Sequence, residues 1–513
     1  MGHLVLPALQ EFITWPAPLF LMIGVLVGLL FGILPGLGGP QVLALLTPLT
    51  FKMDPSSAIV MLIGAMSAIP LAGSLAAILL NLPGHAPSVA STFDGYPLTL
   101  KGKGGYAVGA SASSALFSAI FGAVVLTLIL PFGEKVVLAF SYPEFFMMAL
   151  AGLSMIVVIS KGKSVLKGLI AAVIGLMISF FGFDPITGVT RFTFGSLYLY
   201  NGIEIVPALI GLFAVSEGIE MMHQKGSIAG QSPLAAKLTG VGDGVKSVFK
   251  NFGVFIRSSA IGTFMGMIPG VGGAITTIVA YGQAVQTSKH PERFGKGEIA
   301  GVIAPEAANN SKDASGFVPS LIFGIPSHVE MAVLLGSLTI LGIQPGPKLI
   351  ETDPGKILMI IYALVAGNLI TAIIALFIGG YLTKLALISK QILAPVILAI
   401  SIIGAYALKG EMGDVYVALA FGILGYMFDR FGFPKINIVI PLMVGKLMET
   451  SFHQTLLSMG WTGFFTRPIS LIILVVVIAV IFFTLRNNKA VKTEREKVGD
   501  LSESTKVDGP SAV

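Results

Sequence analysis

A row of apolar segments, each close to the length that crosses a lipid bilayer, constrains this chain more than any other feature. Roughly 17–25 predominantly apolar residues span a bilayer as a helix. Segments of this kind lie at 17–34, 105–131, 144–160, 164–183, 203–222, 251–268, 357–380, 391–408, 415–431, 436–450 and 467–485. Charged residues make up only 11% of the chain, compared with about 25% in soluble proteins. The sequence therefore predicts an all-α polytopic membrane protein and excludes a soluble enzyme, a nucleic-acid-binding protein and a disordered scaffold.

Two further apolar stretches, 57–82 and 314–343, are interrupted by proline, glycine and serine. Each is predicted to form a broken re-entrant helical hairpin, made of two short half-helices rather than one clean span. Broken helices are tolerated at membrane depth only where they are buried in protein or line a cavity. We therefore expect the function of the chain to depend on these two stretches.

The sequence also contains an internal repeat. LPGLGG at 34–39 returns as IPGVGG at 268–273, an offset of 234 residues. The spacing from Gly73 to the sequence LPGH at 82–85 returns from Gly316 to IPSH at 325–328, an offset of 243. Two weaker matches follow in the same order: 181–185 with 431–434, and 205–211 with 439–445. Together these matches predict two homologous halves, a common plan in secondary transporters.

Charge placement predicts that the two halves are inverted relative to each other. Basic residues gather in the central segment 223–250 and in the tail after 485, which places both on the cytoplasmic side. Each half then has an odd number of crossings, the N-terminus faces the periplasm, and 287–313 is an outer loop. The predicted organisation is a first transmembrane repeat at 1–222, a cytoplasmic linker at 223–250, a second repeat at 251–455, an extra C-terminal transmembrane helix at 456–486 and a disordered cytoplasmic tail at 487–513.

The interrupted and repeated segments supply the candidate binding groups. Half-helix N-termini attract anions, and freed backbone carbonyls can coordinate Na⁺. The candidate substrate- and ion-binding residues are Pro35, Gly36, Gly38, Gly73, Ser74, Asn81, Pro83, Gly84, His85, Pro269, Gly270, Gly272, Asn309, Asn310, Ser315, Ser320, Pro326, Ser327 and His328, with a Na⁺ site expected near Asn81, Asn309 and Asn310. The alternative interpretation is that these small residues only permit close helix packing.

Four charged or titratable residues near the breaks allow more than one interpretation. Lys312 and Asp313 form either a pair that faces the substrate or a solvated pair in a loop. His85 and His328 occupy equivalent positions and either serve proton coupling or carboxylate binding, or lie at the membrane interface. A charge at mid-bilayer costs at least ~2.5–3.5 kcal/mol. We therefore expect helix N-termini and hydroxyl groups, with few full positive charges, to hold a bound carboxylate.

Several enzyme signatures are missing from the sequence. The segment GVGDGVKS at 240–247 resembles a phosphate-binding loop, but Val245 stands where the pattern requires glycine. The chain has no cysteine, so it has no disulfide, thiolate metal site or cysteine nucleophile. Neither an enzymatic activity nor a bound cofactor is expected.

The sequence around the breaks resembles a known family. GSLAAILLNLPG at 73–84 is followed by DGYP at 94–97, and EAANN stands at 306–310. These motifs are similar to those of the TctA-type large permease of tripartite tricarboxylate transporters. The resemblance covers about residues 17–485.

The resemblance implies the large permease subunit of a secondary importer for tricarboxylates or related carboxylates, in the bacterial inner membrane with a cytoplasmic C-terminus. It implies two protein partners, a small TctB-type membrane subunit and a periplasmic TctC-type solute-binding protein, and coupling to a Na⁺ or H⁺ gradient. The alternatives are a solitary carboxylate permease that works without a binding protein, and a channel.

Overall fold

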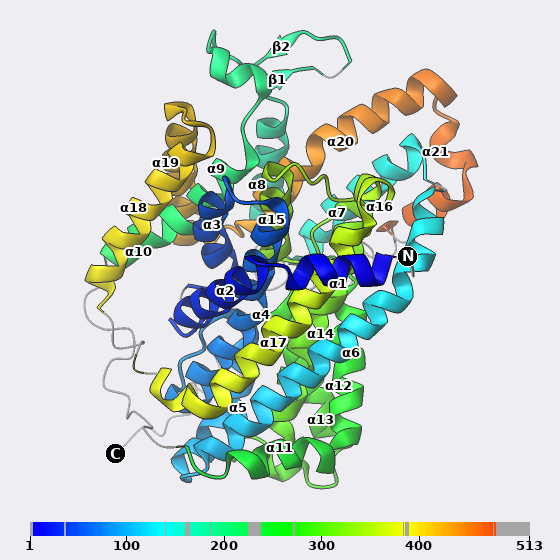
Figure 1. The fold of residues 1–513 in the computed structure, drawn as a ribbon. Coiled ribbons are helices and arrows are strands. Elements are labelled where there is room, and N and C mark those ends of the chain that lie inside the picture. The colour runs from blue at the N-terminus through cyan, green and yellow to red at the C-terminus, as the bar shows by residue number, and fades with distance from the viewer. Residues whose placement is uncertain are drawn as a thin grey trace, which may run out of the picture.

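The computed structural model describes residues 4–34, 37–138, 140–159, 165–184, 186–223, 238–269, 272–382, 384, 389–475 and 477–478. These residues are almost entirely helical, with one small antiparallel hairpin of β1 (Gly182–Phe183) and β2 (Thr190–Arg191) (Figure 1). Among them, six helices are long and apolar enough to cross a membrane, or seven if a pair bent by 72° counts as one span. The chain is therefore an all-α, multi-pass membrane protein.

The first half of the chain runs from α1 to α10. Its helices are α1 (Val5–Ile13), α2 (Ala17–Gly32), α3 (Gly39–Thr50), α4 (Pro55–Leu80), α5 (Val89–Leu100), α6 (Gly104–Leu138), α7 (Tyr142–Ile159), α8 (Val165–Ser179), α9 (Ile205–Leu209) and α10 (Ser216–Met222). Two 3₁₀ turns, Ala86–Ser88 and Leu197–Asn201, and a π-helical turn, Ile210–Val215, complete this half.

The second half of the chain runs from α11 to α21. Its helices are α11 (Val241–Lys250), α12 (Phe252–Gly266), α13 (Gly273–Thr287), α14 (Ala300–Phe317), α15 (Val329–Ile340), α16 (Pro347–Thr352), α17 (Pro354–Leu382), α18 (Lys390–Lys409), α19 (Met412–Phe431), α20 (Ile436–Met459) and α21 (Gly463–Thr466). A π-helical turn, Val318–Ile322, follows α14, and a 3₁₀ turn, Pro291–Arg293, precedes it.

Helices of the two halves pack against each other in reciprocal pairs. α4 of the first half packs against α17 of the second, and α14 of the second half packs against α6 of the first. In the same way α1 packs against α17 and α11 against α6, while α8 packs against α20 and α19 against the π-helical turn 210–215. Each half therefore supplies part of the core of the other.

The prediction of two half-helices at 57–82 is wrong. Residues 55–80 form one helix, α4, which is buried along its whole length. Its first turn is capped by Asp54, whose carboxylate accepts a hydrogen bond from the Ser57 N–H. α4 is surrounded by protein, and Gly64 within it allows α2 to approach closely. The break in the chain comes after the helix, at 81–88. In the second half the predicted break at 314–343 is confirmed, because residues 323–328 separate α14 and its π-helical turn from α15.

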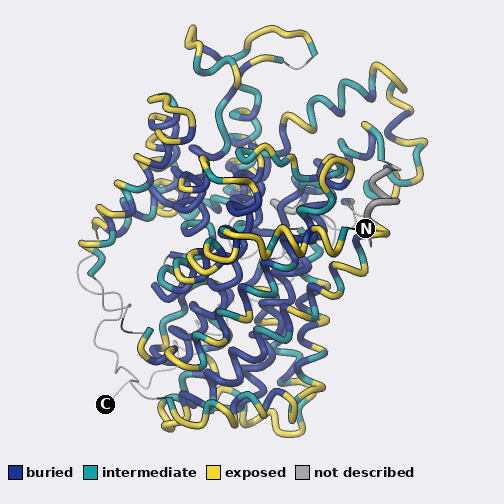
Figure 2. Tube along the Cα trace, viewed as in Figure 1, coloured by how far each residue is buried: buried dark blue, intermediate teal, exposed yellow. Residues whose placement is uncertain are grey.

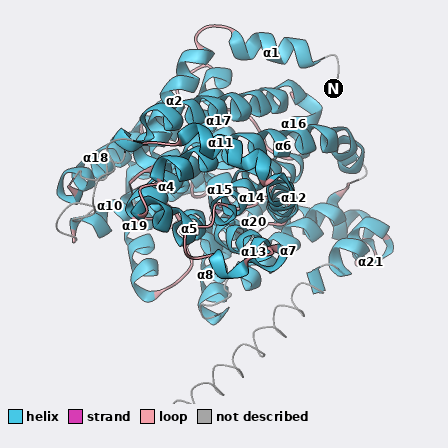
Figure 3. Cartoon of the chain, turned by 90° about the horizontal axis from the view of Figure 1, so that it is seen from below, coloured by secondary structure: helices cyan, strands magenta, loops and turns pink. Residues whose placement is uncertain are grey.

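The sequence did not predict α14, because residues 287–313 were expected to form an outer loop. Every residue of α14 is buried, including its charged side chains. It lies among α6, α12 and α13, and it is labelled beside α12 in Figure 3. The buried residues run through these central helices in Figure 2. Hydropathy detects helices that face lipid, and α14 faces protein instead, so its polar side chains are tolerated.

Two further predicted regions have a different outcome. The segment 223–250, predicted to be a linker, contains the helix α11, which packs against α6. The described residues end at 475 and 477–478, so only the first part of the predicted C-terminal helix at 456–486 is described. The rest of that helix and the whole tail at 487–513 lie outside the described residues.

The close contact of α2 with α4 generates the first prediction. A Cβ atom added at Gly28 would lie 2.3 Å from the Ala65 carbonyl oxygen, so Gly28→Ala forces the two helices apart. We expect a loss of about 1–3 kcal/mol in the free energy of unfolding, typical of overpacking. The matched control is Gly282→Ala in α13, where nothing lies within 4 Å of the added atom. Thermal unfolding of the purified proteins should show a lower midpoint for Gly28→Ala only; equal midpoints would contradict the helix contact.

Candidate functional site

Two short segments, which we call the breaks, separate α-helices at Asn81–Ser88 and at Phe323–His328, and they have the same local causes. Asn81 ends α4 in the left-handed conformation, with φ of 58°, and Gly324 has φ of 71°. Glycine and asparagine are the residues that end helices in this conformation. A proline follows each of them within two residues, at 83 and 326, and prevents the helix from continuing.

A histidine lies in the equivalent place after each break, and a glycine makes room for it. A Cβ atom at Gly73 would lie 2.2 Å from His85 Nδ1. A Cβ atom at Gly316 would lie 2.5 Å from Ser327 Oγ and 3.1 Å from His328 Cε1. The repeated glycine-to-histidine spacing therefore corresponds to a repeated contact: the segment after each helix packs back against a glycine of that helix.

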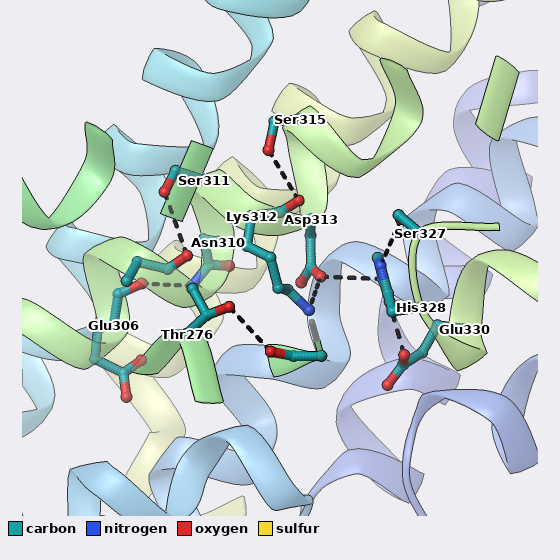
Figure 4. A network of polar contacts seen from close by, with 12 residues as sticks. Thr276, Glu306, Asn310, Ser311, Lys312, Asp313, Ser315, Ser327, His328 and Glu330 are labelled. Carbon is teal, nitrogen blue, oxygen red and sulfur yellow. Dashed lines mark hydrogen bonds and ion pairs between the residues drawn. The ribbon is translucent and has the colours of Figure 1, made fainter. Parts of the chain in front are cut away.

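The second break joins a buried group of polar side chains, which we call the central cluster: Lys312, Asp313, Ser327, His328 and Glu330 (Figure 4). Lys312 Nζ lies 2.5 Å from Asp313 Oδ1, and His328 Nε2 lies 3.3 Å from the same oxygen. On its other side, His328 Nδ1 is 2.8 Å from Ser327 Oγ. His328 Nε2 is 3.8 Å from Glu330 Oε2. The imidazole thus connects residues of α14 with the first turn of α15.

The two glycine-rich loops bring further helix N-termini to this cluster. A Cβ atom at Gly39, the first residue of α3, would lie 2.2 Å from Glu330 Cγ. One at Gly273, the first residue of α13, would lie 3.1 Å from Lys312 Nζ. A narrow cavity at this point is lined by Gly39, Met66, Ile69, Pro70, His85, Asn309, Lys312, Asp313 and Glu330. The cavity therefore receives residues from both halves, including His85 of the first break and Glu330 just after the second.

The structure decides between the interpretations of Lys312 and Asp313. Their residues are only 4% and 8% exposed, and both lie on α14, so the solvated loop pair is wrong. His328, at 7% exposed, lies in the central cluster rather than at an interface with water. Glu330 was missed in the sequence; its position two residues after the second-break histidine was the only available signal.

Several predicted site residues lie in or beside the central cluster. Asn309 and His85 line the cavity. A Cβ atom added at Gly38 would lie 3.6 Å from His85 Cβ. Two serines support the backbone: Ser315 Oγ donates to the Lys312 carbonyl at 3.2 Å, and Ser320 Oγ accepts from the Ser327 N–H at 3.3 Å.

The other predicted site residues have different places. Asn81 is exposed and does not line the cavity. Asn310 Nδ2 donates to the backbone carbonyl of Glu306 at 3.1 Å, and Ser74 is buried on α4. Gly84 N–H donates to the Gly73 carbonyl, Pro83 and Pro326 interrupt the helices, and Pro269 and Gly272 flank the second glycine-rich loop. Pro35, Gly36 and Gly270 lie outside the described residues.

A separate set of charges anchors the β1–β2 hairpin. Arg191 donates two hydrogen bonds to the carboxylate of Glu449 on α20, at 2.7 and 2.9 Å. Backbone N–H groups of Ile186 and Thr187 donate to Asp184 and hold the pKa of that carboxyl below its ordinary value. These contacts fix the hairpin to the end of the molecule and do not reach the cavity.

Comparison with known proteins gives matches along most of the chain. The sequence model of the tripartite tricarboxylate transporter TctA family matches residues 19–440. An uncharacterized 52.8 kDa protein in the TAR-I ttuC' 3' region of Agrobacterium vitis is 33% identical over 481 residues, which cover 93% of this chain and 94% of that protein. An uncharacterized protein in the TAR-II ttuC' 3' region of the same organism is 35% identical over 211 residues, 41% of this chain and 87% of that protein. No solved structure matches the chain.

The buried pair in the central cluster generates the second prediction. Lys312→Met leaves the Asp313 carboxylate buried without its lysine, and removal of one partner of a buried pair typically destabilises a protein by about 3–5 kcal/mol. We expect chemical unfolding of the purified variant to show a loss of that size. The double variant Lys312→Met/Asp313→Asn should recover most of it.

The control is another lysine–aspartate pair of this chain, Lys246 and Asp243, which lies 3.7 Å apart on the surface with side chains 74% and 75% exposed. Lys246→Met should change the free energy of unfolding by less than ~1 kcal/mol. Equal effects of Lys312→Met and Lys246→Met would contradict the burial of the central cluster.

Proposed function

The chain belongs to the tripartite tricarboxylate transporter TctA family, and from this premise we propose that it is the large permease subunit of an importer for tricarboxylates or related carboxylates, driven by an ion gradient. The observation that carries the proposal is the central cluster, a buried set of charges beside the cavity where the two breaks meet. Broken helices beside a cavity deep in the protein are the usual form of a transporter's binding site.

The electrostatics of the cavity suit an anionic solute. Lys312 supplies one full positive charge. The N-termini of α3, α13 and α15 lie at or beside the cavity, and each contributes a partial positive charge. Helix ends and one full positive charge would thus hold the carboxylates.

The acids of the cavity support coupling to a cation. Asp313 and Glu330 line the same cavity as Lys312, so a carboxylate that approaches Lys312 meets two like charges. Like charges at short range oppose binding. Binding becomes favourable when a Na⁺ ion or a proton is taken up with the solute, which links the two fluxes. Uptake of the cation together with the carboxylate is symport.

We further propose that the two halves have inverted topology. The loop between α8 and α9 and the loop between α19 and α20 are equivalent in the repeat. The loop between α8 and α9 follows the C-terminal end of α8. The loop between α19 and α20 lies at the opposite, N-terminal end of α8, where Lys167 Nζ donates to the Phe431 carbonyl at 2.7 Å. Equivalent loops at opposite ends of one helix support opposite orientations, as does the reciprocal packing of the halves.

The proposed assembly includes a small TctB-type membrane subunit and a periplasmic TctC-type binding protein, because the family is that of a tripartite transporter. The proposed location is the bacterial inner membrane, with the basic C-terminal tail in the cytoplasm. Transport by this chain without a binding protein would instead indicate the solitary permease, and conduction without a coupling ion would indicate a channel.

The orientation of the halves can be tested directly because the chain has no cysteine of its own. Val189→Cys lies in the β1–β2 hairpin and Arg430→Cys at the end of α19, and both positions are exposed. We expect a membrane-impermeant maleimide added outside intact spheroplasts to label Val189→Cys alone, with Arg430→Cys labelled only after lysis. Labelling of both residues from the same side would contradict inverted topology.

The role of Lys312 in solute binding is tested by uptake of a radiolabelled tricarboxylate into cells that contain the complete transporter. The variant Lys312→Gln/Asp313→Asn removes one positive and one negative charge, so the net charge of the cavity stays the same, and the variant should fold but lose the positive charge that attracts the solute. We expect uptake at low solute concentration to fall at least tenfold, which corresponds to about 1.4 kcal/mol or more.

The matched control is Lys289→Gln, at an exposed loop position, which should leave uptake unchanged. If the double variant is folded, reaches the membrane and transports at the control rate, the central cluster is not the solute site.

A further inference from the structure

A second buried acid on α14 lies apart from the central cluster. Glu306 is only 1% exposed. In Figure 4 its carboxylate points away from Lys312 and Asp313. Within the described residues no lysine, arginine or histidine nitrogen lies within 4.0 Å of this carboxylate. A buried carboxylate without a positive partner is strongly unfavourable, so its surroundings must supply or admit compensation.

Hydroxyl groups from three other helices surround Glu306. Ser91 of α5 donates a hydrogen bond to Glu306 Oε1. Ser74 of α4 and Ser111 of α6 lie near the same carboxylate without a well-formed hydrogen bond to it. These three serines are 0–1% exposed. Helices α4, α5 and α6 therefore each place one serine hydroxyl beside the carboxylate of α14.

Three of these oxygen atoms have unused capacity. Glu306 Oε2, Ser74 Oγ and Ser111 Oγ are buried and have no hydrogen-bond partner among the described residues. Buried polar atoms without a partner are rare in folded proteins, and each one requires an explanation. A bound ion that takes these oxygen atoms as ligands would satisfy all three at once.

We propose that Glu306, Ser74, Ser91 and Ser111 bind one Na⁺ ion, which is the coupling cation of the transporter. One carboxylate and three neutral hydroxyl groups form an all-oxygen ligand set with a single negative charge, which matches a hard monovalent cation. Ca²⁺ sites usually offer more than one carboxylate, and Glu306 is the single carboxylate of this ligand set. These four ligands differ from Asn81, Asn309 and Asn310, near which the sequence analysis expected Na⁺.

The positions of the four ligands explain how the ion would act on the solute site. This part of the inference rests on the proposed carboxylate transport. Ser74 follows Gly73, the residue against which His85 packs. Ser91 lies just after the same break, on α5. An ion held by both serines and by Glu306 ties the helices before and after the first break to α14. The ion thereby fixes His85, which lines the solute cavity. The positive charge of the ion also offsets the negative charge of Glu306.

The test is a Na⁺ titration of the purified full-length protein in detergent, without any carboxylate. Thermal unfolding is followed while NaCl replaces choline chloride at constant ionic strength, and KCl serves as the second salt. Wild type should gain thermal stability with Na⁺ and not with K⁺. Glu306→Gln, which keeps the size of the side chain, should lose this dependence. Ser111→Ala should raise the half-saturating Na⁺ concentration at least tenfold.

The matched control is Glu292→Gln, a glutamate with a side chain 64% exposed, which should titrate like wild type. An unchanged Na⁺ titration in Glu306→Gln would overturn the proposal. So would a wild-type stability that depends on pH but not on Na⁺, because a proton would then compensate the carboxylate. Na⁺-specific stabilisation in a protein that transports no carboxylate would support the ion site and count against the proposed importer instead.

Discussion

The burial of α14 within protein is the constraint on which the rest of the structure depends. This helix carries Glu306, Lys312 and Asp313, and such charges are expensive in lipid. Close packing keeps lipid away from them: added Cβ atoms at Gly262 and Gly266 of α12 would lie 2.2 Å from the Ala308 carbonyl oxygen and 2.4 Å from that of Lys312. Both proposed sites exist only because neighbouring helices enclose this one.

Reciprocal packing then brings the two breaks together. α14 lies against α4, α5 and α6 of the first half, so the residues after its own break meet those after the first break. His85 and Lys312 consequently line one cavity although they are far apart in sequence. The cavity is lined by residues of both halves, so a movement between the halves would change its shape. This is the geometry that an alternating-access transporter requires.

The sequence predicted the parts of the fold that face lipid and the parts that repeat. The apolar spans, the second break and the equivalent positions of His85 and His328 followed from hydropathy and spacing. α14 could not be found in this way, because its surface is covered by protein and carries no apolar signal. The first break also lies later than predicted, because α4 continues as one helix through its glycine and serine residues and the chain turns only at Asn81. Glu330 enters the site through a tertiary contact with Gly39, which no local pattern encodes.

The central claim is that a carboxylate solute binds where the two breaks meet. An experimental density map of the protein at saturating tricarboxylate tests it most directly. The account predicts ligand density in contact with Lys312, His85 and Asn309, inside the cavity that residues of both halves line. Density confined to the separate cavity beside Glu204 and Lys409, with the central cavity unchanged, would contradict it.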